Sequence, residues 1–164
     1  SGCNLTGMKI SLLVIGKTDA GYVREGIAEY EKRLQRYVTY EMKVLPDVKN
    51  AKNLTEALQK EKEGEMILGE ILATDWIVLL DEKGREFTSV EFAGFLAQKM
   101  VGSVKKMVFV VGGPYGFSER VYQRANDKIS LSRMTFSHQM IRMIFTEQLY
   151  RAMTILKGEP YHHE

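Results

Sequence analysis

Apolar and polar positions follow two alternating periods along the chain, and these periods predict strands and helices in turn. Patterns typical of strands, with apolar residues either continuous or alternating with polar ones, occupy 10–15, 39–45, 76–80 and 107–111, and a shorter one occupies 129–131. Between these runs, apolar residues recur every three or four positions, as on one face of a helix. The regular order predicts an α/β fold in which a mostly parallel sheet carries helices on both faces.

Residues that commonly cap helices precede the predicted helices. We expect helix N-caps at Asp19, at Asn53 with Glu56, at Thr88 with Glu91, and at Ser118. The stretch KEKEGE at 60–65 predicts a largely solvated helix face, and Gly64 weakens that helix. The run 39–45 is broken by Pro46, which predicts an edge strand.

Length and composition place the chain among ordinary globular proteins. Of its 164 residues, 45% are hydrophobic and 27% are charged. We predict one domain over 8–164, and we interpret 1–7, which lack periodicity, as a tag remnant or a short extension. No apolar run is long enough to span a membrane, and the single cysteine, Cys3, suggests neither a disulfide nor a metal site. A cytoplasmic location is the simplest interpretation, and a net charge of +2 decides little about nucleic-acid binding.

A ligand site is expected where strands end, because open parallel sheets bind ligands beyond the carboxyl ends of their strands. Three such ends are candidates: Leu80–Asp81, Gly112–Gly113 and 129–131. The turn GGPYG at 112–116 lets a ligand approach the main chain closely. A plain glycine-rich turn is the competing interpretation. The glycine spacing does not match the dinucleotide fingerprint G-x-G-x-x-G.

Four motifs in one order carry a family resemblance. GGPYG, LSRMTFSHQMIR, EQLYRA and the terminal EPYHHE resemble the RlmH family of SPOUT methyltransferases, and the similarity runs from Met8 to the end. The resemblance implies a C-terminal trefoil knot and a homodimer. It also implies methylation of N3 of a pseudouridine in large-subunit rRNA, with S-adenosylmethionine as the methyl donor. We expect the assembled ribosome to be the substrate, and neither a metal nor a membrane to take part.

The same resemblance assigns the site residues. For the methyl donor it implies Leu80, Gly112, Leu131, Ser132, Arg133, Met134, Thr135 and Phe136. Tyr161 and His162 match the family's terminal pair and are the catalytic candidates, while His138, Arg142 and Arg151 are candidates for RNA contacts. Relatives often have proline where this chain has Ser137, which can cap the long helix in its place.

Several alternatives stay open at this stage. Arg151 could simply pair with Glu147, four residues before it, and the terminal residues could form a disordered tail. Arg142 and Arg151 are about half a turn out of phase, so they cannot both serve one site from one helix. The helix from Met140 to Leu156 is apolar around most of its circumference, which predicts burial against a second subunit. A non-catalytic ribosome-binding or assembly factor, and a small-molecule nucleotide enzyme, are the competing functions.

Overall fold

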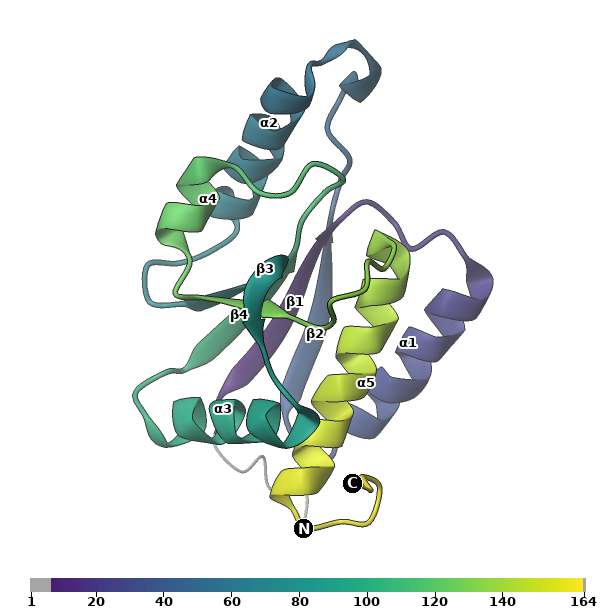
Figure 1. Ribbon diagram of the computed structural model, residues 1–164, viewed down its shortest axis with the longest axis vertical. Helices are drawn as coiled ribbons and strands as arrows, with labels where there is room; N and C mark the ends of the chain where they lie inside the picture. The colour runs from purple at the N-terminus through teal and green to yellow at the C-terminus, as the bar shows by residue number, and fades with distance from the viewer. Residues whose placement is uncertain (1–6, 164) are drawn as a thin grey trace.

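Five strands and five α-helices alternate along the chain in a computed structural model that describes residues 7–163 (Figure 1). Most of the expected extension 1–7, and Glu164, therefore lie outside the described residues. The elements are β1 (Lys9–Ile15), α1 (Gly21–Leu34), β2 (Thr39–Leu45), a 3-10 turn (Ala51–Asn53), α2 (Glu56–Gly69), β3 (Trp76–Glu86), α3 (Ser89–Val101), β4 (Lys106–Val111), α4 (Glu119–Arg124), β5 (Asp127–Ser130) and α5 (His138–Leu156).

The strands form one sheet in the order β2-β1-β4-β3-β5. Every neighbouring pair is parallel, so the predicted parallel α/β architecture is confirmed. β2 lies at an edge, as the proline after it predicted. Because all the strands run in one direction, their carboxyl ends meet at a single edge of the sheet, where a ligand site is expected.

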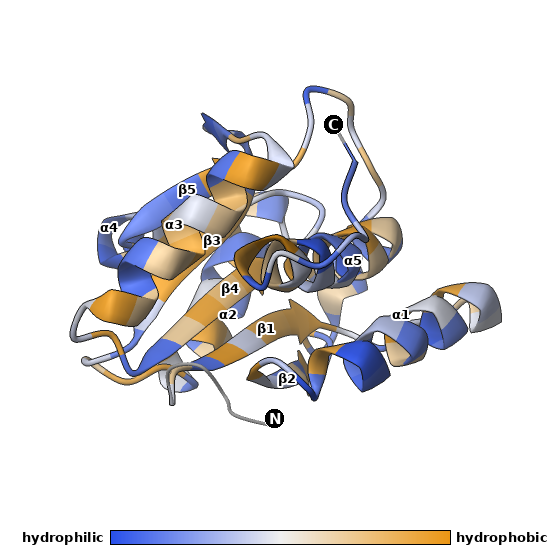
Figure 2. Ribbon diagram, turned by 90° about the horizontal axis from the view of Figure 1, so that it is seen from below, coloured by the Kyte–Doolittle hydropathy of each residue, from blue (hydrophilic) through white to orange (hydrophobic). Residues whose placement is uncertain are grey.

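Helices cover both faces of the sheet, and this explains the continuous apolar runs. In β4, Met107 and Phe109 join a core cluster with α3 and α5, whereas Val108 and Val110 join a second cluster with α2 and α4. Successive side chains of a strand point to opposite faces, so a strand covered twice is apolar throughout. Figure 2 shows the hydrophobic colouring concentrated on β1 and β4, between the two helical layers. No helix in the described chain is long and apolar enough to cross a bilayer.

β3 is longer than predicted and irregular beyond Leu80. Leu80 and Arg85 both lie opposite Ile129 of β5, so the residues between them bulge out of the ladder. A Cβ built on Gly84 would lie 2.6 Å from the Ile129 backbone nitrogen. Residues 82–84 therefore belong to a strand bulge, which crosses β5 so closely that only glycine fits at 84.

The helix starts only partly follow the predictions. Ser118 and the Thr88–Glu91 capping box are confirmed, and Ser137 Oγ accepts from Met140 N at 3.1 Å at the start of α5. The Asp19 and Asn53 caps are wrong. The residue before α1 is Ala20, which makes no side-chain cap, and α2 begins after Thr55, whose hydroxyl accepts from Leu58 N. Both helices therefore begin one or two residues later than predicted, which is the usual uncertainty of a helix boundary.

Candidate active site

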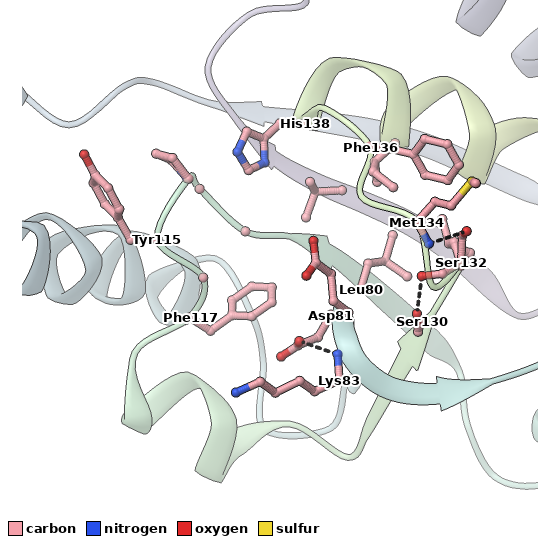
Figure 3. A pocket seen from close by; sticks show the side chains of 18 of the residues that line it. Leu80, Asp81, Lys83, Tyr115, Phe117, Ser130, Ser132, Met134, Phe136 and His138 are labelled. Atoms are coloured by element: carbon pink, nitrogen blue, oxygen red, sulfur yellow. Dashed lines mark hydrogen bonds between the residues drawn. The ribbon is translucent and has the colours of Figure 1, made fainter.

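A cavity of about 360 Å³ opens at the carboxyl edge of the sheet (Figure 3). Its walls come from the ends of β3, β4 and β5 and from the start of α5, so the three strand ends singled out in the sequence are brought together. Its volume falls within the range of small-molecule sites. The lining includes the predicted residues Leu80, Gly112, Leu131, Ser132, Met134, Phe136 and His138.

The glycine turn after β4 forms one wall of this pocket. Gly116 has a φ of +81°, a conformation that side chains strain to adopt, and its N–H donates to the Gly113 carbonyl at 3.2 Å. A Cβ on Gly112 would lie 3.1 Å from the Phe117 ring, which also lines the pocket. A branched residue at 112 would therefore push Phe117 and deform the wall.

The loop after β5 forms the opposite wall and is held by its own serines. Ser130 Oγ donates to the Ser132 carbonyl at 2.9 Å, and Ser132 Oγ accepts from Met134 N at 2.9 Å. In the described chain, no backbone-to-backbone hydrogen bond outside strands and helices involves residues 131–136. Peptide groups without such partners can hydrogen-bond a ligand.

Two of the predicted donor-binding residues do not line the cavity. Arg133 is highly exposed and pairs with Glu86 at 3.1 Å, on the outside of the loop. Thr135 is exposed as well.

Asp81 lines the pocket at one of the strand ends singled out in the sequence, although no role in the site was assigned to it there. Its carboxylate accepts from Lys83 N at 3.0 Å and from the Tyr122 hydroxyl at 2.5 Å. Burial, followed by the bond to Asp81, raises the pKa of Tyr122 to about 12, so this phenol remains a donor at neutral pH. The available signal was the position of Asp81 directly after a buried strand.

His138 projects into the pocket from the first residue of α5 (Figure 3). Partial desolvation, with the nearby positive charge of Arg142, lowers the pKa of His138, and a hydrogen bond with the Gly112 backbone partly offsets this. The imidazole is therefore neutral near pH 7, so it can accept a proton or a hydrogen bond.

The structure contradicts the prediction that Arg142 contacts RNA. Its side chain is 2% exposed and lies beneath the surface. Its guanidinium donates to the carbonyls of Ile15 and Gly16 at 2.9 and 2.8 Å, and to Thr18 Oγ1 at 3.0 Å. Arg142 therefore fastens α5 to the end of β1. No local pattern indicates this role, because the partners are more than a hundred positions away along the chain.

The other predicted residues gather at the far end of α5. Arg151 pairs with Glu147 at 3.1 Å, as the alternative interpretation expected, and its Nη1 lies 3.2 Å from His162 Nδ1. The Tyr161 ring packs edge-on against Tyr150, with ring centres 4.7 Å apart. Burial, with smaller contributions from neighbouring side chains, raises the pKa of Tyr161 to about 12, so its phenol cannot serve as a base near neutral pH.

The tail cluster and the pocket are far apart within one chain. Thirteen positions of one helix separate His138 from Arg151, a rise of roughly 20 Å at 1.5 Å per residue. Figure 1 shows the C-terminal tail at the opposite end of α5 from the loop that enters it. Within one chain of this structure, the tail therefore does not close over the pocket.

Comparison with known proteins adds the family. Residues 8–162 match the family described as "Predicted SPOUT methyltransferase". A protein of Parabacteroides distasonis is 66% identical over 157 residues, which are 96% of this chain and 100% of the relative. Relatives from Flavobacterium johnsoniae and Porphyromonas gingivalis are 55% and 56% identical over the same shares. All three are named "Ribosomal RNA large subunit methyltransferase H".

Proposed function

The chain belongs to the SPOUT methyltransferase family, and from this premise we propose that it methylates large-subunit ribosomal RNA. The finer proposal is transfer of a methyl group from S-adenosylmethionine to N3 of a pseudouridine. The observation that carries it is the convergence of three strand-end loops on one pocket. The similarity to a protein named as an rRNA methyltransferase, over 96% of this chain, supports it.

The pocket suits an adenosine-containing methyl donor. Leu80, Leu131 and Met134 offer apolar cover for the faces of a base, and the loop 131–136 offers backbone groups for its edge. The turn at Gly112 lets a ligand approach the main chain. When bound, S-adenosylmethionine supplies an activated methyl group on a positively charged sulfur.

The work left to the protein is positioning and removal of one proton. N3 of a pseudouridine is protonated at neutral pH, so it must lose that proton for a methyl group to be attached there. The neutral His138 imidazole lies in the pocket, and His162 is the second candidate to accept this proton. Tyr161 keeps its phenolic proton near neutral pH, so it can hydrogen-bond the substrate but cannot act as the base.

A homodimer would bring His162 to a pocket. Helix α5 lies between α1 and α3 and leaves a partly exposed stripe at helical spacing, formed by Ile141, Ile144, Gln148, Arg151 and Ile155. The three isoleucines of this stripe are apolar, partly exposed and on one face, which suits a two-fold contact with a second copy. This contact could place the tail of one subunit over the pocket of its partner. The tail and the pocket, which lie roughly 20 Å apart within one chain, would then meet across the dimer.

Family membership also implies the trefoil knot, which we include in the proposal. The tight crossing of Gly84 over β5 is consistent with a chain path of that kind. For the RNA we retain His138 and Arg151 as contacts, with Arg151 shared between Glu147 and the substrate. The assembled ribosome, in the cytoplasm, is the expected substrate, because a small and weakly basic protein offers little surface for free RNA.

Methyl incorporation tests the proposal. Ribosomes from a strain that lacks the modification are incubated with the protein and radiolabelled S-adenosylmethionine, and the labelled nucleoside is identified. We expect one N3-methylated pseudouridine per large subunit. Binding of ribosomes without any label transfer would instead favour a non-catalytic assembly factor, and binding of neither ribosome nor donor would refute both.

A further inference from the structure

One buried acidic side chain is left unexplained by the pocket. Glu63 of α2 is 4% exposed, although its place in the stretch KEKEGE predicted a solvated face. Gln59 donates to its Oε2 at 3.3 Å, and no described residue hydrogen-bonds Oε1. A buried carboxylate without a cationic partner is costly, so its retention requires a reason.

Glu63 lies directly behind the glycine turn of the pocket. A Cβ built on Gly113 would lie 2.7 Å from the Glu63 Cδ, so the carboxyl group occupies the space that a side chain at 113 would need. Gly113 also lines the cavity. A single residue without a side chain therefore separates the carboxyl group from whatever occupies the pocket.

The packing of α2 holds Glu63 in this place. At the next residue, Gly64, a Cβ would lie 3.2 Å from Ser118 Cβ, so α2 approaches the start of α4 closely. Ile67, one turn further, is buried in the core cluster beneath the sheet. Gly64, which weakens the helix in isolation, is thus required by the approach that buries Glu63.

The surroundings of Glu63 favour its neutral form. Burial raises the pKa of Glu63, the Gln59 bond opposes this, and the negative charge of Asp47, in the loop after β2, adds to it. In the described chain, α4 contributes the Ser118 hydroxyl to this region, and no basic side chain pairs with Glu63. A positive charge on the other side of Gly113 would favour the ionised carboxylate instead.

We propose that Glu63 is the electrostatic partner of a positively charged ligand in the pocket and acts on it across Gly113. The proposal rests on the proposed function, in which that ligand is the sulfonium methyl donor. Two van der Waals contacts of about 3.5–4 Å each, one from Glu63 to Gly113 and one from Gly113 to the ligand, span the distance between the two charges. Glu63 therefore selects the charged donor over the neutral product, S-adenosylhomocysteine, and assists product release.

The coupling has a definite sign. Because a bound cation favours the ionised carboxylate, the ionised carboxylate must favour the cation to the same extent. Donor affinity should therefore rise with pH as Glu63 ionises, and donor binding should release protons. S-adenosylhomocysteine, whose sulfur is uncharged, should show a much smaller effect.

Calorimetry with the two ligands tests the idea. At pH 8, we expect Glu63→Gln to reduce the preference for S-adenosylmethionine over S-adenosylhomocysteine roughly tenfold, as two charges about 7 Å apart predict at an intermediate dielectric. Glu65→Gln removes the same charge from an exposed position of the same helix and should leave the preference unchanged. Proton release from Glu63 should persist in His138→Gln and vanish in Glu63→Gln.

The outcomes separate this inference from the proposed function. If the wild-type protein binds both ligands and Glu63→Gln keeps the same preference, Glu63 has only a packing role and the inference fails alone. If the wild-type protein does not bind S-adenosylmethionine, both fail.

Folding is checked by melting temperature. Because the pKa of Glu63 is raised, the folded state holds this proton more tightly than the unfolded state. The wild-type free energy of unfolding therefore falls as the pH rises through the folded-state pKa of Glu63. Over the same pH range, Glu63→Gln should become more stable relative to the wild type.

Discussion

Mixing two inactive variants would show whether the active site is built from two subunits. Gly112→Val disables the pocket by pushing Phe117, 3.1 Å from the added Cβ, and leaves the tail intact. His162→Ala disables the tail and leaves the pocket intact. The helix rise of roughly 20 Å between the two regions prevents them from meeting in one chain, so each variant lacks a different half of the proposed site.

The expected recovery follows from symmetry. In a two-fold dimer, a mixed pair joins the intact pocket of one variant to the intact tail of the other at one of its two sites. Random pairing in a one-to-one mixture makes half of the dimers mixed, so activity should recover to about a quarter of the wild-type value. The assay is methyl incorporation into ribosomes after the two proteins are unfolded together and refolded.

The controls decide the interpretation. Each variant alone should stay inactive after the same treatment, and sedimentation should show dimers of unchanged stability. A mixture that is no more active than the separate variants, with mixed dimers shown by mass, would refute a shared site. A stable monomer at micromolar concentration would refute the dimer itself, and His162 would then need a conformation unlike the one described here.

Three further substitutions test the assignments within one chain. Gly112→Val alone should abolish S-adenosylmethionine binding by calorimetry while circular dichroism shows a retained fold, and unchanged affinity would remove the glycine turn from the site. Arg142→Leu should reduce the free energy of unfolding in urea by about 3–5 kcal/mol, because carbonyls at the end of β1 lose charged donors, and a loss below about 1 kcal/mol would contradict the anchoring role. Gly84→Ala should cost about 3 kcal/mol, since the new Cβ would lie 2.6 Å from the Ile129 nitrogen, and a wild-type melting temperature would show that β5 can move aside.

Much of the candidate site was predictable because its parts are local. The glycine turn, the loop 131–136 and the start of α5 are continuous segments, and the rule that ligands bind at strand ends brings them together. The assignments that failed depend on position in space. Arg142 and His138 are four residues apart on one helix, yet one is buried beneath β1 and the other faces the pocket.

The sequence by itself determined the elements, their order and the parallel sheet, because apolar periodicity records which side of each segment faces a core. It also marked the glycine turn and three of the helix caps. Only the tertiary structure decided the strand order, the bulge at Gly84, the burial of Glu63 and Arg142, and the distance from the tail to the pocket. These features depend on contacts between segments far apart in the chain, and a local pattern of apolar and polar residues carries no record of which distant segment lies beside it.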